Sequence, residues 1–367
     1  MAYGSRALAA AAMIGVLGSS AGKAQDITIG ALLPLTGPAA PVGVEQQQGV
    51  QFAIDKANAA GGVAGRKIVG LYEDSQGKPD VGVLSFNKLV DLRNTPIVIT
   101  AFSSVSLAIA PLATRKRVLV VNSAAQSNQL AKASPYLINT IPLVRDETGS
   151  IVNYMAKTLG KKRAAIVYEN AAAGIDAKDD FKHAFEKLGG VINDEEPVEF
   201  GQTNYRPALL KAAAGKPDFV YFAVTQGHPT YVEQARQIPD FPIGAGTTLV
   251  NPSFGYPGSV GWYQSAIRSQ APPELEAEFK AKFNSPGMSF FSREYYNATT
   301  IVLDAIASVI AKGQPVNGET VRAAIFDKKV FKSSIANLRF ETSNTAIRGV
   351  EIQQYGPTER KVIAIEE

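Results

Sequence analysis

The chain has no cysteine, one tryptophan and two histidines in 367 residues. Without cysteine it has no thiol nucleophile, and it can form no disulfide, iron–sulfur cluster or cysteine-ligated zinc site. His183 and His228 each stand alone in their segment, and a lone histidine makes neither a catalytic triad nor a metal site. We therefore expect no bound metal ion and no cofactor.

The motifs of common enzyme classes are missing as well. No Gly-x-Gly-x-x-Gly follows the first apolar run, and residues 215–217 (Gly-Lys-Pro) lack the spacing and the hydroxyl of a phosphate-binding loop. Residues 258–261 (Gly-Ser-Val-Gly) lack the glycine spacing of a nucleophile elbow. We interpret the acidic pairs Glu73-Asp74 and Asp179-Asp180 as solvated ends or caps. Together these absences predict that the protein is not an enzyme.

The chain also lacks a dominant sign of charge. It has 37 lysines and arginines against 33 aspartates and glutamates, for a formal net charge of +4. Because opposite charges are interspersed and form no basic stripe, we expect no nucleic acid partner. After residue 24 no stretch approaches the roughly 18 uninterrupted apolar residues of a transmembrane helix. We therefore expect the mature chain to be soluble.

The first 24 residues have the composition of a secretory signal. Arg6 precedes an alanine-rich apolar run over residues 7–17, and Gly22 and Ala24 are small residues placed for cleavage before Gln25. The run is too short to span the roughly 30 Å hydrocarbon core of a bilayer. We expect this segment, residues 1–24, to be removed and the mature protein to be periplasmic.

After that segment, strand-like and helix-like apolar patterns alternate. The run 27–33 predicts a strand, and apolar residues at helical spacing predict a helix over 44–58 that Gly61-Gly62 ends. The alternation continues to about residue 311, and it predicts an α/β fold of parallel, doubly wound sheets with helices on both faces. A chain of this length is too long for one ordinary core and suits two lobes.

Strand-like runs return near the end of the chain. They are expected at residues 335–340, 350–355 and 362–365. Two lobes in simple tandem would not need these late strands, and no low-complexity linker separates the halves. We therefore expect the chain to cross between the lobes more than once through ordered segments, which would form a hinge.

Small polar residues follow two of the predicted strands. The strand at 97–100 runs into Ser103 and Ser104, and the strand at 118–121 runs into the polar stretch 122–126. The carboxyl ends of parallel strands line the crevice where ligands bind. Serine hydroxyls and free N–H groups at a helix N-terminus suit a carboxylate. A plain serine cap is the alternative, but two such edges together favour a binding site.

Short motifs spread over the chain after residue 24 match one family pattern. They lie at residues 29–38, 49–58, 61–66, 72–75, 103–104, 121–124, 168–170, 218–222 and 295–298. By these motifs the chain resembles the type I periplasmic binding proteins of the branched-chain amino acid class. Those proteins are the receptors of Leu/Ile/Val-type ABC importers.

The resemblance implies two Rossmann-like lobes, joined by a three-crossover hinge, that close on a small molecule. The crossovers are expected near residues 142–144, 264–268 and 345–349. Lobe I would then comprise residues 25–143 plus 268–347, and lobe II residues 144–267 plus 348–367. The resemblance also implies a monomer whose partner is a membrane permease, and a sensory receptor is the alternative role for this fold.

The resemblance also implies a set of binding residues. Ser103 matches the family's carboxylate-binding serine, with Ser104 beside it, Ala124 matches a backbone contact, and Gln126 stands where amino acid binders usually carry threonine. The second lobe is expected to close on the ligand through residues around Asn170, Gln226 and Thr247. A ring of the ligand could pack on Phe102 or Phe291.

Two departures from the family pattern bear on the ligand. Amino acid binders supply an acid from the second lobe to pair the ammonium group, and Thr247 stands at that place, with no acid between residues 241 and 263. They also present an aromatic residue where this chain has the small residues 171–174. Burying an ammonium without a carboxylate is costly. We therefore expect a carboxylate without an ammonium, an aromatic or 2-oxo acid, with a hydrophobic amino acid as the alternative.

Overall fold

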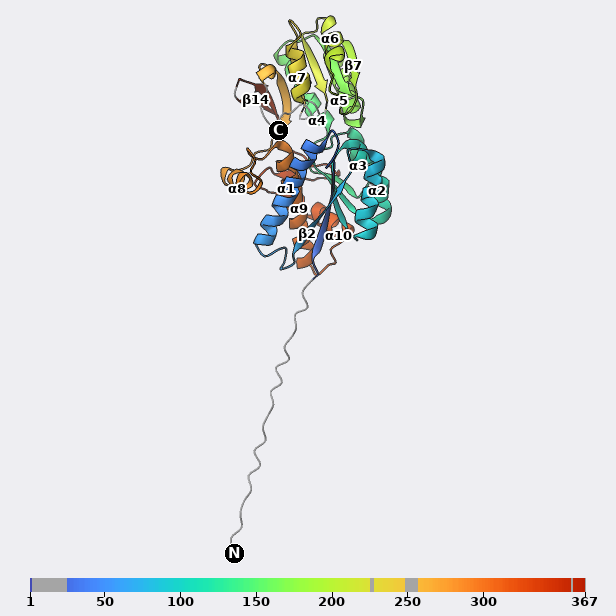
Figure 1. Cartoon of the computed structure of the whole chain (residues 1–367), viewed down its shortest axis with the longest axis vertical. Coiled ribbons are helices and arrows are strands. Elements are labelled where there is room, and N and C mark those ends of the chain that lie inside the picture. Colours follow the sequence, from blue (N-terminus) through green and yellow to red (C-terminus); the bar gives the residue numbers. More distant parts are fainter. Residues whose placement is uncertain (2–24, 225–227, 248–256, 358, 367) are drawn as a thin grey trace.

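The computed structural model describes Met1 and residues 25–224, 228–247, 257–357 and 359–366. These form two α/β lobes that are stacked along the long axis of the molecule (Figure 1). Most of the predicted signal, residues 1–24, and the predicted site residue Gln226 lie outside the described residues.

The first lobe is built on a five-stranded parallel sheet in the order β2-β1-β3-β4-β5. Its strands are β1 (Ile27–Leu33), β2 (Ile68–Asp74), β3 (Ile97–Thr100), β4 (Leu119–Asn122) and β5 (Leu137–Asn139). Its helices are α1 (Ala40–Ala59), α2 (Pro79–Asn87), α3 (Ser103–Lys116), α8 (Pro273–Phe283), α9 (Phe290–Ala311) and α10 (Gly318–Lys328). A short antiparallel ribbon pairs β11 (Val330–Phe331) with β12 (Leu338–Arg339). The central strands β3 and β4 are continuous buried runs, as expected for a sheet that is covered on both faces.

The second lobe carries a seven-stranded sheet in the order β14-β13-β10-β9-β8-β6-β7. Its parallel strands are β6 (Arg163–Glu169), β7 (Val191–Val198), β8 (Phe219–Ala223), β9 (Ile243–Gly246) and β10 (Tyr263–Ile267). The late strands β13 (Val350–Tyr355) and β14 (Arg360–Glu366) extend this sheet in antiparallel fashion. The helices are α4 (Val144–Asn153), α5 (Ala172–Lys187), α6 (Arg206–Ala214) and α7 (His228–Arg236).

The chain passes between the lobes three times. It leaves the first lobe between β5 and α4, returns between β10 and α8, and crosses again between β12 and β13. The late β segments predicted from the sequence belong to this last crossing and to the edge of the second sheet. The predicted α/β fold of two lobes with a three-crossover hinge is therefore confirmed.

Local sequence signals place the helices that border the lobe junction. Pro79 lies in the first turn of α2, where its missing N–H costs nothing. The backbones of α1 and α9 come so close that a Cβ on Gly49 would lie 2.3 Å from the carbonyl oxygen of Ser292. Glycine is therefore required at this point, and it fixes which face of α1 turns toward α9.

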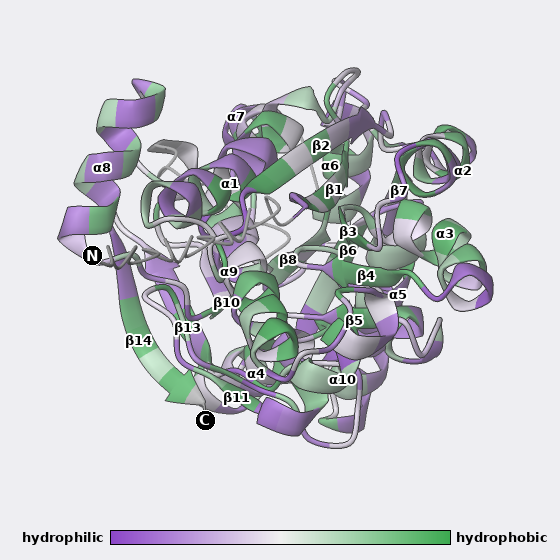
Figure 2. Ribbon diagram, turned by 90° about the horizontal axis from the view of Figure 1, so that it is seen from below, coloured by the Kyte–Doolittle hydropathy of each residue, from purple (hydrophilic) through white to green (hydrophobic). Residues whose placement is uncertain are grey.

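Hydropathy follows the layers of the fold. In Figure 2 the strands β1, β3 and β4 are largely green inside the molecule, whereas the outer helix α8 is mostly purple. The long helix α9 is an exception among the helices, because most of its residues are buried against the first sheet. Within the part of the chain that the structure describes, no helix combines the length and the apolar character needed to cross a membrane.

Candidate functional site

A cleft between the two lobes lies at the carboxyl ends of their parallel strands. It encloses a cavity of about 250 Å³ that is lined by both lobes. Among the described residues, four phenylalanines line it: Phe102, Phe290 and Phe291 from the first lobe, and Phe200 from the second. Its polar side chains come from Gln46, Lys78, Ser103, Ser104, Gln126, Glu169 and Asn170. An apolar cavity with a few placed polar groups has the usual composition of a small-molecule site.

The N-terminus of α3 opens on this cleft. Ser103 and Ser104 are the first two residues of the helix, and both line the cavity. The N-cap position is Phe102, and no side chain caps the helix there. Ser103 is buried, and its Oγ accepts a hydrogen bond from the N–H of Ser127 at 3.1 Å. The first-turn amides and the helix dipole therefore present positive charge to the cleft.

Phe102 holds an unusual backbone conformation at this point. Its φ of 64° and ψ of 131° lie outside the regions that residues with a Cβ adopt readily. Such strain costs roughly 1–3 kcal/mol and is found mainly at functional sites. The ring of Phe102 packs edge-to-face on Phe200 of the second lobe, with centroids 5.5 Å apart. Phe102 therefore joins the α3 N-terminus to the opposite lobe.

The loop after β4 forms the second polar edge. The buried side chain of Asn122 organises it: Oδ1 accepts from the N–H of Ala124 at 3.3 Å and of Ala125 at 2.8 Å, and Nδ2 donates to the carbonyl of Ala125 at 2.7 Å. This turn brings Ala124 and Ala125 to the cavity wall beside Ser103. The two edges predicted from the sequence thus lie together in one cleft.

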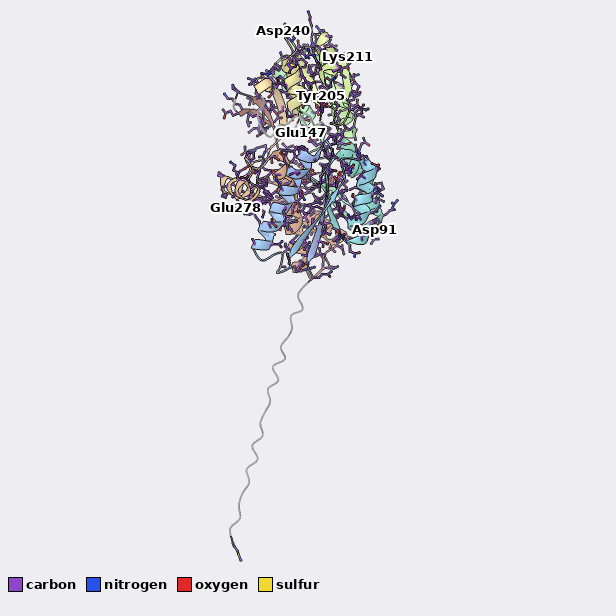
Figure 3. All side chains as sticks on the ribbon, in the orientation of Figure 1. Asp91, Glu147, Tyr205, Lys211, Asp240 and Glu278 are labelled. Atoms are coloured by element: carbon purple, nitrogen blue, oxygen red, sulfur yellow. The ribbon has the colours of Figure 1, made fainter. Side chains whose placement is uncertain are left out.

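Gln126 lines the cleft but is already bonded within the protein. Its Nε2 donates to Glu147, a fully buried carboxylate in α4 of the second lobe, and to the carbonyl of Pro142 at 3.4 Å. In Figure 3 Glu147 lies at the junction of the two lobes. The Gln126 amide, expected to donate to a ligand, therefore also links the first lobe to α4.

Glu169 is a site residue that the sequence analysis missed. It ends β6, is only 2% exposed and lines the cleft from the second lobe. Burial, and to a lesser extent the negative charge of Glu169, raises the pKa of the Tyr205 phenol to about 12. The signal for it was a lone acid at the carboxyl end of a buried parallel strand, the kind of position that faces a crevice.

The other predicted second-lobe residues differ in placement. Asn170 lines the cleft next to Glu169, and its Nδ2 donates to Glu199 at 3.4 Å. Thr247 is fully buried, is not among the described residues that line the cleft, and shares a side-chain hydrogen bond with the phenol of Tyr221. Phe291 lines the cleft on the α9 side, as expected for a residue that packs against a ligand ring.

A polar contact also joins the lobes beside the cleft. In the first lobe, the hydroxyl of Ser127 and the N–H of Asn128, the latter at 2.8 Å, donate to the carboxylate of Asp176 in α5. The Nδ2 of Asn128 donates to Asp180, one turn further along the same helix. Burial raises the pKa of Asp180, and the neighbouring Asp176 charge adds to the rise. With the ring contact of Phe102 on Phe200, these hydrogen bonds join the two lobes beside the cleft.

The architecture and cleft agree with one family. The model of the family described as periplasmic binding protein matches residues 26–359. The chain belongs to this periplasmic binding protein family. The predicted membership among the periplasmic binding proteins is therefore confirmed, and these proteins are a family of non-enzymatic, extracytoplasmic solute receptors.

Curated relatives of this periplasmic binding protein align over most of its length. The Leu/Ile/Val-binding protein BraC3 of Rhizobium johnstonii is 29% identical over 331 residues, which cover 86% of this chain and 87% of the relative. The leucine-, isoleucine-, valine-, threonine- and alanine-binding protein of Pseudomonas aeruginosa is 27% identical over 350 residues, covering 92% and 91%. These alignments cover most of both lobes, and they support the resemblance to the branched-chain amino acid class.

Solved structures share the fold. A solute-binding protein of an ABC transporter from Rhodopseudomonas palustris BisB5, in complex with 3,4-dihydroxybenzoic acid, superposes with a TM-score of 0.84 at 21% identity, covering 93% of this chain and 97% of that one. The branched-chain amino acid binding protein LivJ of Streptococcus pneumoniae, in complex with isoleucine, gives a TM-score of 0.80 at 21% identity, covering 93% and 99%. The two lobes of this periplasmic binding protein therefore have the fold of these solute-binding proteins.

Proposed function

We propose that this periplasmic binding protein captures a small apolar carboxylate, an aromatic or 2-oxo acid, and delivers it to the membrane permease of an ABC importer. It binds the ligand as a monomer and without transforming it. The observation that carries the proposal is the presence, in one cleft, of an uncapped helix N-terminus and four phenylalanine side chains.

The ligand carboxylate docks at the N-terminus of α3. The first-turn amides and the hydroxyls of Ser103 and Ser104 supply donors, and the helix dipole favours the negative charge. Each hydrogen bond to a charged group contributes roughly 1.5–3 kcal/mol. Lys78, exposed at the rim of the cleft, adds a positive charge that attracts the anion.

The apolar body of the ligand packs against the phenylalanines. Phe290 and Phe291 line the first-lobe side, and the edge-to-face pair of Phe102 and Phe200 closes the other. A cavity of about 250 Å³ lies just below the roughly 300–1,000 Å³ of pockets for drug-sized ligands, so it suits a small molecule. Micromolar affinity corresponds to about −8.2 kcal/mol. Two or three charge-assisted hydrogen bonds together with burial of a ring are sufficient for that.

Closure of the lobes completes the site. Phe200 reaches Phe102, and the Ser127–Asn128 turn reaches Asp176, only when the lobes come together. A ligand that contacts both lobes stabilises this state, because its contacts are stronger there than in an open form. The permease can then distinguish a loaded receptor from an empty one by its closed shape.

One observation favours a second candidate, a hydrophobic amino acid. Glu169 places a buried carboxylate in the cleft from the second lobe, and such a group can pair with a buried ammonium. The absence of an acid at Thr247 therefore does not by itself remove the amino acid alternative. Solved structures of the same fold support either ligand, since one binds isoleucine and others bind 3,4-dihydroxybenzoic acid or benzoate.

Matched ligand pairs separate the two candidates. Thermal-shift and calorimetric titrations would compare phenylalanine with phenylpyruvate and 3-phenylpropanoate, and leucine with 4-methyl-2-oxopentanoate. Stabilisation by the ammonium-free acids alone supports the proposal, and stabilisation by the amino acids alone supports the alternative. A protein that responds to no carboxylate contradicts both.

Export is proposed from the predicted signal, residues 1–24. The mature protein is expected in the periplasmic fraction with Gln25 at its N-terminus, because small residues stand at the −3 and −1 positions before it. Intact-mass measurement of protein from that fraction tests this directly. A cytoplasmic protein that keeps Met1 contradicts it.

A further inference from the structure

Gln46 is a buried side chain in the cleft with an unused hydrogen-bonding group. It lies on α1, is 1% exposed and lines the cavity. Among the residues that the structure describes, no donor reaches its Oε1. A buried carbonyl without a donor destabilises a folded protein, and such groups are rare in native structures. The carboxamide of Gln46 is therefore retained at a cost to stability.

The neighbours of Gln46 show that this burial is specific. Three glutamines stand in a row, but Gln47 and Gln48 are half-exposed and have access to water. Gly49, one turn further along α1, presses against the backbone of α9 at Ser292. Because that close contact fixes the rotation of α1, Gln46 cannot turn outward to solvent without separating the two helices.

The cleft carries acceptors as well as donors. The α3 N-terminus supplies donors at Ser103 and Ser104, and these suit a carboxylate. Gln46 lines the cavity and carries a buried carbonyl oxygen without a donor, and Glu169 lines it with a buried carboxylate that accepts hydrogen bonds when ionised. A ligand with only a carboxylate and a hydrocarbon body binds the donors at the α3 N-terminus, and it leaves the carbonyl oxygen of Gln46 without a donor.

We propose that the ligand carries a second polar group, an O–H or N–H donor away from its carboxylate, and that Gln46 is the specificity-determining residue that binds it. This inference rests on the proposed capture of a carboxylate in the same cleft. A hydroxyl or an amino group placed at Gln46 satisfies the buried carbonyl. A ligand without that donor is rejected because the carbonyl stays unpaired.

The test compares Gln46→Met, which keeps the length of the side chain and removes its hydrogen bonding, with Gln47→Met as the control. Calorimetry measures Kd for benzoate and for its 3- and 4-hydroxy and 3- and 4-amino derivatives. The same is done for 3-phenylpropanoate, 3-(4-hydroxyphenyl)propanoate and phenylalanine. The wild type should bind a donor-bearing member roughly 5- to 150-fold more tightly than its parent. In Gln46→Met this preference should disappear, with binding of the parent unchanged or tighter, while Gln47→Met behaves as wild type.

The binding outcomes distinguish this inference from the proposed function. Equal weakening of parent and derivative in Gln46→Met overturns the role of Gln46 and leaves carboxylate capture intact. Equal binding of donor-bearing and donor-free carboxylates by the wild type would likewise overturn the role of Gln46 and leave carboxylate capture intact. Failure of the wild type to bind any carboxylate counts against the proposed function instead.

A ligand-free measurement tests the inference independently of any ligand panel. Replacing an unpaired buried carboxamide by an apolar side chain of similar shape should leave the melting temperature of the empty protein unchanged or raise it. A lower melting temperature for Gln46→Met than for Gln47→Met would show that the carboxamide is already bonded within the protein, and it would overturn the proposal. Comparison of the hydroxyl and amino series then identifies which donor the site prefers.

Discussion

Arg348 and Glu294 form a bidentate ion pair that is almost completely removed from solvent. The guanidinium donates from Nη2 to Oε1 at 3.0 Å and from Nη1 to Oε2, and the two side chains are 1% and 0% exposed. Nη2 also donates to the carbonyl of Arg268 at 2.7 Å, and Nη1 to the carbonyl of Thr140 at 3.4 Å. Thr140, Arg268 and Arg348 lie on the three different crossovers. The Arg348 side chain thus connects the three crossovers to one another and to Glu294 of α9.

Loss of this arginine should destabilise the protein strongly. In Arg348→Met, Glu294 stays buried without its partner, and breaking such a pair costs roughly 3–5 kcal/mol. Urea denaturation monitored by circular dichroism measures the loss. Arg348→Lys should recover only part of it, because an ammonium cannot form the same planar fork.

An exposed ion pair provides the control for Arg348. Arg117 and Glu319 lie 3.5 Å apart with side chains that are 71% and 62% exposed. Arg117→Met should cost at most about 1 kcal/mol, as surface pairs do. If Arg348→Met costs no more than this control, the ion pair does not stabilise the hinge.

The lowered pKa of Asp74, at the end of β2, predicts that the stability of the protein depends on pH. Burial alone would raise the pKa of Asp74, but hydrogen bonds from the Thr36 hydroxyl and from the N–H groups of Gln76, Leu35 and Thr36 hold it below its usual value. Because the pKa of Asp74 is lower in the folded than in the unfolded protein, the ionised carboxylate stabilises the fold at pH values above the unfolded-state pKa. That stability should disappear as pH falls through the folded pKa.

The variant Asp74→Asn should therefore be less stable than wild type at pH 7, by about 1 kcal/mol for this partly exposed group. The difference should begin to narrow as the pH falls below about 4, where the carboxyl of the unfolded wild type takes up a proton, and it should disappear only below the lowered pKa of the folded protein. Asp91→Asn, which removes a half-exposed carboxylate that pairs with Lys116, is the control. A difference between Asp74→Asn and wild type that stays constant from pH 7 to pH 3 contradicts the assignment.

The sequence predicted the part of the site that depends on strand order. Residues after consecutive parallel strands must meet at one edge of a sheet. For this reason the sequence places Ser103 and Ser104 beside the stretch 122–126, and both serines line the cleft together with Ala124, Ala125 and Gln126. The hinge could be anticipated on similar grounds, because strands returned after the last long helix.

The rest of the site depends on contacts that a local pattern does not contain. Gln46 has the sequence context of any polar residue on an amphipathic helix, and only the approach of α9 buries it. Glu169 belongs to a strand whose end is covered by the other lobe. Thr247 stands at the place of the family's acid, but the hydrogen bond of its side chain with Tyr221 is set by tertiary packing.

Ser103→Ala should weaken the binding of any carboxylate. The change removes a hydroxyl at the α3 N-terminus, and a lost bond to a charged group corresponds to roughly 10- to 150-fold in Kd. Calorimetry with the tightest ligand of the panel measures this effect. Ser106→Ala is the matched control: Ser106 lies on the same helix, is fully buried and contacts Thr100 rather than the cleft. Unchanged affinity in Ser103→Ala, or equal loss in both variants, would remove Ser103 from the site.

Closure can be blocked without altering any residue that lines the cleft. Gly201 of the second lobe faces Pro38 of the first, and a Cβ on Gly201 would lie 2.8 Å from the proline ring. Proline is rigid, so in Gly201→Ala the lobes must stay further apart. Affinity should then fall by roughly tenfold or more, since each 1.4 kcal/mol lost from the closed state is a factor of ten.

Gly189→Ala separates this effect from backbone strain. Gly201 and Gly189 have similar positive φ values, 76° and 81°, but a Cβ on Gly189 would meet nothing within 4 Å. Both variants should therefore lose similar stability in urea, because each forces alanine into a left-handed conformation. Only Gly201→Ala should lose affinity, and only it should fail to contract on adding ligand in small-angle X-ray scattering. If both variants bind and contract alike, the contact between Gly201 and Pro38 is not part of the closed state, and closure must be limited elsewhere.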